Sequence, residues 1–411
     1  MYHSRHLEQK LLDLSQYFKV IILTGSRQVG KSTLLTHLFP TLKHIVFDPV
    51  QDLFGARSDP DLFLANFPPP VILDEIQFVP ELLAAIKRKV DESPSAGQYF
   101  LTGSQNFSLL KATAESLAGR AAILHLGGMT SFELADMTNN NWLGAYLTNP
   151  ESVLLDPVQI LPSTETLYAQ LWRGSFPAVN DLPAHIVPEF YTSYLQTYIE
   201  RDVRLLGNIR DLHEFSRFLG LCAALTAQEI NHAQLAREIG LAQNTAAHWL
   251  DVLTYSYLWQ ELWPYHGNTI KRLSKKRKGY ITDTGMACYL QRISTPEALA
   301  GHPLLGALFE SFCVNMLLNL STSLPLAPKF YHWRTNAGAE VDLILELNAR
   351  FYPIEIKCKA TLSGNDGRGI MAFRDSYPGM DIAPALILYA GQNCYRLNPH
   401  IIAMPWNRVL V

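Results

Sequence analysis

The chain has 411 residues, which is too long for one ordinary hydrophobic core and predicts roughly two to four domains. Hydrophobic residues make up 48% of it and charged residues 17%, a composition that excludes a disordered chain. The formal net charge of −3 neither favours nor excludes a nucleic acid partner, so local charge has to decide.

Cysteine usage and apolar segments indicate the setting of the chain. The five cysteines are scattered and form no CxxC pair, so we expect a reducing, cytoplasmic location. The first residues, MYHSRHLEQKLLDL, contain no apolar segment typical of a signal peptide. No apolar run of about 18 residues is visible, and we therefore expect no membrane span.

Three types of pattern follow one another along the chain. Apolar runs (VIILTG, HIVFD, PVILDE, QYFLTGS) alternate with helical segments (KSTLLTHLF, PELLAAIKRKVDE), which predicts a parallel α/β sheet covered on both faces. Residues 136–165 read as a connection or an insertion, 187–260 as mostly helical, and strand-like runs return after about residue 325. We predict an α/β nucleotide-binding domain at 1–165, a helical domain at 166–295 and an α+β domain at 296–411.

The stretch TGSRQVGKST follows the first apolar run and fits G-x-x-x-x-G-K-[ST]. In such a loop, backbone N–H groups surround phosphate oxygens, the lysine reaches the β- and γ-phosphates, and the hydroxyl binds Mg²⁺. The alternative is a glycine-rich turn that caps an ordinary helix. The predicted ATP-binding residues are Gly25, Ser26, Arg27, Gln28, Val29, Gly30, Lys31, Ser32 and Thr33, with Lys31 also catalytic and Ser32 also a Mg²⁺ ligand.

A pair of acids follows the strand-like run in FPPPVILDEIQ. Asp74 is predicted to hold Mg²⁺, directly or through water, and Glu75 to act as general base towards the attacking water. The alternative is that these acids are ordinary charges at a helix start. Pro70 shortens the usual apolar run before them to three residues.

Polar residues after the next predicted strand are candidates for sensing the γ-phosphate. Parallel sheets bind ligands at the carboxyl ends of their strands, which makes Thr102, Ser104 and Gln105 the candidates, against the alternative of a plain turn. Arg120, before a further apolar run, is either a surface arginine or a residue that reaches the γ-phosphate of a neighbouring subunit in a homo-oligomer.

The helical segment contains the pattern of a helix-turn-helix at residues 231–259. Leu235 and Ala236 form one apolar face, Gly240 suits a tight turn, and Ala246 and Leu250 face inward on the second helix. Its exposed candidates are Gln243, Asn244, Thr245 and His248. Asp283, in ITDTG, is predicted to cap the helix that follows it.

Downstream, KRLSKKRK carries six positive charges in eight residues. Such a strip can neutralise DNA phosphates with salt-dependent affinity, although winged helices also bind proteins and charge runs are often solvated surface. The predicted nucleic acid contacts are Lys271, Arg272, Lys275, Lys276, Arg277 and Lys278.

Two strand-like runs near the C-terminus carry acids. EVDLILEL contains Glu340 and Asp342, and thirteen positions after Asp342 comes Glu355-x-Lys357, the layout of the PD-(D/E)xK nucleases. Alternate residues of a strand share a face, so Glu355 and Lys357 are predicted to project together. Asp342 and Glu355 would hold a second Mg²⁺, Lys357 would position water, and Glu310 could add a ligand. The fold is also used without cleavage.

Taken together, these motifs resemble a known family. TGSRQVGKSTLL, VILDEIQ, YFLTGSQNFSLL, ESLAGR and SFEL, followed by RGSFPAV, YLQTYIERDV, ITDTG and WRTNAGAEVDLIL…IEIK, are similar to the AAA-type ATPases that carry a C-terminal DUF4143 region. The resemblance covers nearly the whole chain. It implies a P-loop NTPase domain, a winged-helix-like domain and a nuclease-like domain, and no particular physiological role.

The sequence leaves three functions open. The first is a Mg²⁺-dependent ATPase whose nucleotide state controls DNA engagement by the C-terminal domains. The second is an ATP-dependent signalling or assembly module that binds a protein partner through the winged-helix-like domain. The third is a nuclease that ATP regulates.

Overall fold

The chain was examined as a computed structural model, which describes residues 2–104, 117–155, 158–162, 165–198, 203, 209, 211–267 and 276–410. The chain divides into two compact units. The N-terminal unit comprises Ser4–Gly128 with Tyr255–Tyr257, and the C-terminal unit comprises Met1–His3, Met129–Thr254 and Leu258–Val411. The predicted boundary near residue 165 thus differs from the boundary between the two units, and the three predicted domain ranges stay a prediction.

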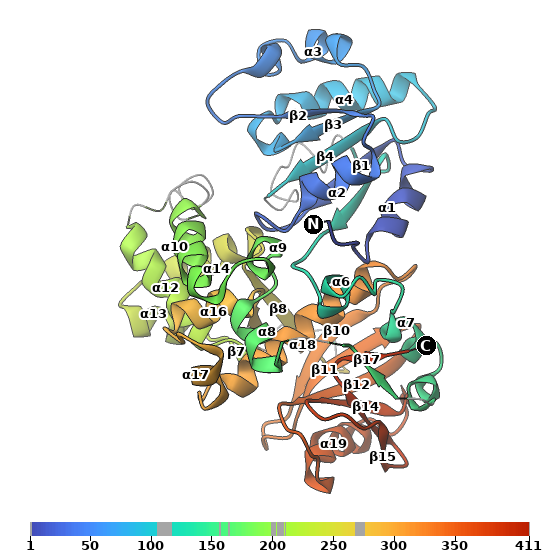
Figure 1. The fold of residues 1–411 in the computed structure, drawn as a ribbon, viewed down its shortest axis with the longest axis vertical. Helices are drawn as coiled ribbons and strands as arrows, with labels where there is room; N and C mark the ends of the chain where they lie inside the picture. Colours follow the sequence, from blue (N-terminus) through green and yellow to red (C-terminus); the bar gives the residue numbers. More distant parts are fainter. Residues whose placement is uncertain are drawn as a thin grey trace. The chain divides into compact units, whose positions relative to one another are not determined.

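The N-terminal unit is built on a parallel sheet with the order β2-β3-β4-β1-β5 (Figure 1). Every neighbouring pair runs parallel, which confirms the predicted α/β class. The strands are β1 (Val20–Thr24), β2 (Lys43–Val46), β3 (Val71–Asp74), β4 (Tyr99–Gly103) and β5 (Ala121–His125).

Helices cover this sheet because its central strands have no polar face. Every residue of β1, β3 and β4 is buried, as expected for strands that are covered on both sides. The helical segments are α1 (Glu8–Ser15), α2 (Lys31–Leu38), α3 (Pro60–Asn66) and α4 (Glu81–Glu92), with short 3₁₀ turns η1 (Leu53–Gly55) and η2 (Ile76–Phe78). In α4, Leu82, Ile86 and Val90 recur at the spacing of one helix face and join the core.

The C-terminal unit begins with mostly short elements, and two of them contact the end of the chain. Its first segments are α6 (Ser131–Leu134), α7 (Trp142–Thr148), η4 (Pro150–Leu154), β6 (Gln159–Ile160), α8 (Leu167–Arg173), α9 (Pro177–Asn180), η5 (Ala184–Ile186) and α10 (Val187–Tyr198). β6 pairs with β17 (Arg408–Val409), and the Tyr146 hydroxyl donates to the Pro384 carbonyl at 2.8 Å. Residues 136–165, predicted as a connection or an insertion, therefore contain regular elements that belong with the end of the chain.

A helical stretch with three strands follows. Its elements are α12 (Leu212–Ala224), β7 (Gln228–Glu229), α13 (His232–Ile239), α14 (Gln243–Tyr255), β8 (Trp259–Pro264), β9 (Lys278–Ile281), α16 (Thr284–Leu290) and α17 (Pro296–Ala300). Gly240 ends α13 in the left-handed region at φ 80°, as a tight turn requires. Leu235, Ala246 and Leu250 are buried, as the pattern predicted.

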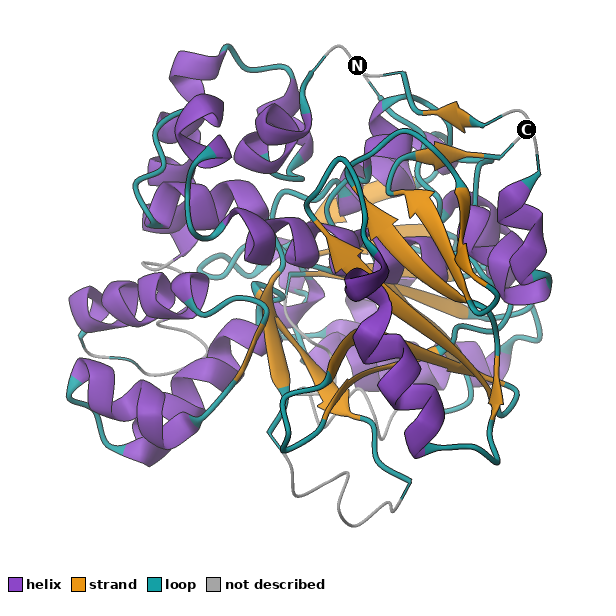
Figure 2. Ribbon diagram, turned by 90° about the horizontal axis from the view of Figure 1, so that it is seen from below, coloured by secondary structure: helices purple, strands orange, loops and turns teal. Residues whose placement is uncertain are grey.

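One mixed sheet runs through the C-terminal unit, with the order β15-β16-β14-β12-β11-β10-β8-β9-β7 and β13 beside β12. Parallel pairing of β8 with β10 joins the strands of the helical stretch to those of the C-terminal part. Figure 2 shows these strands in orange and the helices beside them in purple. The remaining elements are α18 (Leu305–Thr322), β10 (Lys329–Arg334), β11 (Glu340–Leu347), β12 (Arg350–Lys357), η7 (Gly364–Gly367), α19 (Arg368–Ser376), β13 (Asp381–Ile382), β14 (Ala385–Tyr389), β15 (Tyr395–Asn398) and β16 (Ile401–Pro405).

Among the described residues, α18 is the one helix long and apolar enough to cross a membrane by length and composition. Half of its apolar window is buried inside the protein. Two of its polar side chains bond to β9: Glu310 accepts from the Tyr280 hydroxyl at 2.8 Å, and Asn315 donates to the Ile281 carbonyl at 2.9 Å. These contacts are those of a helix that packs within a protein core.

Candidate functional site

The loop after β1 has backbone positions that only glycine fits without strain. Gly25 lies at φ 146°, and a Cβ atom there would stand 2.1 Å from the Leu126 carbonyl oxygen. Gly30 lies at φ 93° and directly precedes α2. Two of the motif positions are therefore fixed by close backbone approach and by handedness. The loop leaves the carboxyl end of a central strand, where open α/β sheets bind their ligands.

Lys31 begins α2 and folds back across this loop. Its Nζ donates to the Gly25 carbonyl at 2.9 Å and to the Ser26 carbonyl at 2.8 Å, and the residue is buried. The lysine thus spans the concavity that the motif predicts for phosphate groups.

Arg5 also bonds to this loop, and the motif analysis missed it. Its guanidinium donates to the Val29 carbonyl at 2.8 Å and to the Gly127 carbonyl at 2.7 Å. Arg5 is buried although it carries a charge, so these carbonyls supply part of the polar environment that a buried charge needs. An isolated arginine twenty residues before the motif gives no signal in the sequence.

Asp74 is the last residue of β3, and its carboxylate contacts the side chains of Ser32, Thr102 and His44 from neighbouring elements. Its carboxylate accepts from Ser32 Oγ at 2.5 Å and from Thr102 Oγ1. Two predicted Mg²⁺ ligands, Ser32 and Asp74, are thus brought together, and predicted sensor Thr102 bonds to the same carboxylate. These are the hard oxygen donors that Mg²⁺ prefers, so the residues present fit that ion.

His44, on β2, is a further neighbour of Asp74 that sequence reasoning missed. Its Nε2 lies 3.1 Å from Asp74 Oδ2. Although burial raises it, the hydrogen bonds from His44, Ser32 and Thr102 lower the pKa of Asp74 overall. This contact exists because β2 lies beside β3 in the sheet, and no local sequence motif predicts that strand order.

Glu75 follows Asp74 in a left-handed backbone conformation, at φ 59°. Its carboxylate accepts from Gln77 Nε2, and the same amide nitrogen lies 3.3 Å from Ser104 Oγ. The predicted base and one predicted sensor are therefore connected through Gln77, which sequence reasoning did not single out although it stands in the LDEIQ motif. Gln105, the third sensor candidate, lies outside the described residues.

Arg120 lies away from this constellation in its own subunit. Both alternatives for it, a surface arginine or a residue that reaches the γ-phosphate of a neighbouring subunit, stay predictions. Arg120 precedes Ala121, the first residue of β5, and Ala121 pairs with Val20 at the amino end of β1. The phosphate loop follows the opposite end of β1, roughly 15 Å away at 3.3 Å per residue. The Arg120 guanidinium pairs instead with Asp91, at 2.6 Å.

In the C-terminal unit, the predicted acidic residues come together on three elements. Glu355 and Lys357 of β12 contact each other, with Oε1 and Nζ 2.5 Å apart. Asp342 of β11 accepts from the Ile356 N–H at 2.9 Å. Glu310 reaches the same place from α18 and Glu340 from β11, because both bond to one further side chain.

That side chain is Lys278, and its position corrects the prediction that it contacts DNA. Lys278 begins β9, is only 2% exposed, and does not belong to an exposed basic strip. Its Nζ lies 2.6 Å from Glu310 Oε1, 2.7 Å from Glu340 Oε1 and 3.2 Å from Asp342 Oδ1. These acids surround an ammonium group supplied by the chain itself.

The carboxyl groups of this cluster have strongly different affinities for protons. Burial, with the nearby Asp342 charge, raises the pKa of Glu310 to about 7 and that of Glu355 to about 8. Burial also acts on Asp342, but the Lys278 and Lys357 ammonium groups and the Ile356 N–H lower its pKa overall. Part of the cluster's charge is thus removed by protonation.

Only part of the predicted basic strip can be placed. Lys271, Arg272 and Lys275 lie outside the described residues. Lys276 and Arg277 are exposed, and the Arg277 guanidinium stacks 3.7 Å above the Trp263 ring and bonds to Glu261 at 2.7 Å. A polar hollow of about 610 Å³ lies beside Lys276, and its other lining residues are Ala227, Gln228, Glu229, Arg334, Thr335, Asn336 and Glu340.

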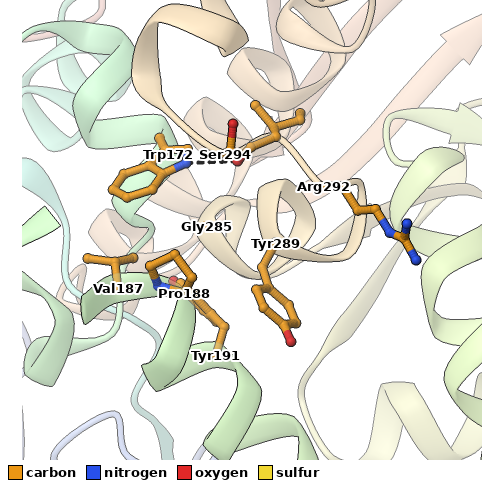
Figure 3. A pocket seen from close by; sticks show the side chains of 9 residues that line it. Trp172, Val187, Pro188, Tyr191, Gly285, Tyr289, Arg292 and Ser294 are labelled. Atoms are coloured by element: carbon orange, nitrogen blue, oxygen red, sulfur yellow. Dashed lines mark hydrogen bonds between the residues drawn. The ribbon is translucent and has the colours of Figure 1, made fainter. Parts of the chain in front are cut away.

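A second, apolar pocket of about 240 Å³ lies between α8, α10 and α16 of the C-terminal unit (Figure 3). It is lined by Trp172, Val187, Pro188, Tyr191, Gly285, Tyr289, Arg292, Ile293 and Ser294. The Tyr191 hydroxyl donates to Asp283, which also accepts from the Met286 N–H at the start of α16. Asp283 therefore caps that helix, as predicted.

Comparisons with known proteins agree with the arrangement of the chain. The model of the AAA domain family matches residues 17–135, and two domains of unknown function match 164–297 (DUF8612) and 305–409 (DUF4143). Uncharacterized proteins Rv2008c of Mycobacterium tuberculosis and Mb2031c of Mycobacterium bovis are each 30% identical over 393 residues, which cover 95% of this chain and 81% of theirs.

Two solved structures show a weaker likeness. The Walker-type ATPase PABY2304 of Pyrococcus abyssi is 17% identical with a TM-score of 0.46, over 71% of this chain and 96% of that one. The RuvB Holliday junction branch migration motor of Thermotoga maritima is 16% identical with a TM-score of 0.31, over 66% and 95%. Because both TM-scores are below 0.5, these structures do not determine the family of the chain. The relatives and the family models show that the chain belongs to the family that joins an N-terminal AAA domain with a P-loop ATPase fold to a C-terminal DUF4143 domain.

Proposed function

We propose that the chain hydrolyses ATP with Mg²⁺ and couples its nucleotide state to DNA engagement by the C-terminal unit. The observation that carries the hydrolysis is the contact of Ser32 with Asp74 at 2.5 Å, beside the phosphate loop. Ser32 and Asp74 would hold Mg²⁺, which supplies charge neutralisation of the phosphate oxygens when bound. Backbone N–H groups of the loop and Lys31 would bind the β- and γ-phosphates.

Glu75 is the residue we assign to the attacking water. Gln77 bonds to its carboxylate and fixes its direction, while Thr102 and Asp74 tie the ends of β3 and β4 together. A carboxylate held in this way can accept the proton of the water as the water attacks the γ-phosphate. Ser104, in contact with Gln77, is suited to register whether that phosphate is present.

DNA engagement is supported by the order of elements α12-β7-α13-α14-β8-β9, which is that of a winged helix. The exposed residues Gln243, Asn244 and His248 of α14 would face a groove, and Lys276 and Arg277 in the connection between β8 and β9 would contact phosphates. Thr245 is less exposed than these three, and Lys271, Arg272 and Lys275 belong to the same connection in the sequence.

Filter binding of a DNA duplex at increasing salt tests this half of the proposal. A winged helix that contacts phosphates should lose at least about tenfold in affinity between 50 and 200 mM salt. The double variant Lys276→Ala and Arg277→Ala should bind the duplex more weakly than the wild-type chain does at the same salt concentration. No binding at the lower salt concentration, or binding that the double variant does not change, would favour a protein partner over DNA.

A further inference from the structure

The carboxylate cluster of the C-terminal unit has the layout of a nuclease metal site, but a divalent cation does not fit its contacts. Asp342 accepts from Lys278 through Oδ1 and from the Ile356 N–H through Oδ2. Glu355 Oε1 accepts from Lys357. Among the described residues, Glu355 Oε2 is the buried carboxylate oxygen of this cluster that has no hydrogen-bond partner.

The remaining acids, Glu310 and Glu340, both contact Lys278, although Glu340 also lines the polar hollow beside Lys276. Glu310 Oε1 accepts from both Lys278 and the Tyr280 hydroxyl, at 2.6 and 2.8 Å, and Glu340 Oε1 accepts from Lys278 at 2.7 Å. A Mg²⁺ ion needs carboxylate oxygens at about 2.1 Å in octahedral geometry. The described residues contain no group of three or more His, Cys, Asp or Glu side chains that could hold a metal ion.

We propose that the ammonium of Lys278 takes the place of the divalent cation, so that this nuclease-like site binds no metal and does not cleave nucleic acid. A buried group of acids requires compensating positive charge, and Lys278 supplies it at the centre while Lys357 supplies it at the edge. Two ammonium groups then serve four acids, and the Arg334 guanidinium adds positive charge 3.5 Å from the second carboxylate oxygen of Glu340.

Because the ammonium of Lys278 replaces a metal ion, its contacts also hold elements of the C-terminal unit together. Lys278 belongs to β9, whereas its partners belong to α18 and β11. The ion pairs therefore fasten β9, and with it the β7–β9 strands, to α18 and β11. A lysine is attached to the chain and cannot dissociate as a metal ion can. These ion pairs therefore persist under conditions in which metal ions are scarce. This inference does not depend on ATP hydrolysis.

Metal titration of the full chain provides the test. All proteins carry Lys31→Ala and contain no nucleotide, so that the phosphate loop does not contribute a metal site of its own. In the parent protein we expect no Mn²⁺ binding by calorimetry and no rise in the unfolding temperature with Mn²⁺. Lys278→Met should lower the unfolding temperature, and Mn²⁺ should restore part of the loss, because four acids then lack their cation.

Lys276→Met is the matched control, since it removes an exposed lysine two residues away. It should behave as the parent does towards Mn²⁺. The proposal is overturned if the parent binds Mn²⁺ in the cluster, which loss of binding in Asp342→Asn would reveal, or if Lys278→Met is as stable as the parent and equally indifferent to Mn²⁺.

A second pair of measurements keeps the proposal testable if Lys278→Met does not fold. Lys278→Met combined with Asp342→Asn and Glu310→Gln removes acid charge together with the lysine, and should fold without a response to Mn²⁺. Failure of that triple variant to recover any stability would count against the charge argument. Independently, the wild-type chain should leave supercoiled plasmid intact with Mg²⁺ or Mn²⁺. Cleavage that Asp342→Asn abolishes would refute the proposal.

Discussion

Ser32 Oγ donates a 2.5 Å hydrogen bond to Asp74 Oδ2, and this contact joins the start of α2 to the end of β3. The two residues are 42 positions apart in the sequence and meet because β3 and β1 both end at the same edge of a parallel sheet. A hydroxyl and a carboxylate at that edge would supply two ligands to Mg²⁺, and nucleotide phosphates and water would supply the others. The first two predictions depend on this arrangement.

Asp74→Asn keeps the shape of the side chain but removes its negative charge. We expect the rate of Mg²⁺-dependent ATP hydrolysis to fall by about 100-fold or more, because the charged oxygen opposite Ser32 is lost. Nucleotide binding without Mg²⁺ should change little. Steady-state kinetics across a range of Mg²⁺ concentrations measure the effect. If Asp74→Asn hydrolysed ATP at the wild-type rate, at the Mg²⁺ concentration that suffices for the wild-type chain, the assignment would be contradicted.

Glu75→Gln should separate ATP binding from hydrolysis. The amide cannot accept the proton of the attacking water, so we expect ATP to bind and the rate to fall by about 10² to 10⁴-fold. Gln77→Ala should cause a smaller loss, about tenfold, because the carboxylate stays but loses the amide that holds it. Equal losses in the two variants, or full activity in Glu75→Gln, would show that another group activates the water.

Arg120→Ala tests whether the arginine acts within its own subunit. Because Arg120 lies at the amino edge of the sheet and pairs with Asp91, we expect wild-type ATP affinity and, in dilute protein, a wild-type hydrolysis rate. The rate is to be measured over a wide range of protein concentrations, with Arg88→Ala, another exposed arginine paired with an aspartate, as the control. A loss in Arg120→Ala alone that grows with protein concentration would indicate a neighbouring subunit's site.

The carboxylate cluster predicts how the stability of the C-terminal unit changes with pH. Glu355 keeps its proton up to about pH 8 in the folded state, against 4.5 as its ordinary value. The folded state therefore binds more protons than the unfolded state between these values, and the free energy of unfolding falls as pH rises through this window. One such group accounts for at most about 1.4 kcal/mol per pH unit.

Chemical denaturation at pH 5.5 and pH 8.5 measures this effect, followed by fluorescence of the tryptophans in the C-terminal unit. Glu355→Gln should flatten the dependence, since the amide stays neutral at both pH values. A wild-type chain whose C-terminal unit is more stable at pH 8.5 than at pH 5.5 would contradict the raised pKa.

Local motifs predicted the phosphate loop and the acids after β3 because each of them is contiguous in the sequence. The residues that support them were not predictable in this way. Arg5 and His44 reach the site through tertiary contacts that depend on the order of strands. A sequence also does not show which edge of the sheet a residue such as Arg120 occupies.

Lys278 shows the same limit of local motifs for a residue whose charge pattern indicated exposure although the residue is buried. It closes a run of six basic residues, so its charge pattern indicated a solvated strip. It also opens KGYI, whose four residues are all buried in β9, and the alternation of the strand turns its side chain towards the acids. The spacing of Asp342 and Glu355-x-Lys357 predicted which acids meet, but not the cation that lies between them.

Mg²⁺-dependent ATP hydrolysis by the purified chain, measured with and without a DNA duplex at low and high salt, tests the central claim most directly. The proposal predicts hydrolysis that Lys31→Ala abolishes, that DNA stimulates at low salt, and that returns to the basal rate as salt weakens phosphate contacts. Nucleotide binding and hydrolysis that persist in Lys31→Ala would contradict the assignment of the phosphate loop. A rate that DNA leaves unchanged at every salt concentration would contradict the coupling to DNA.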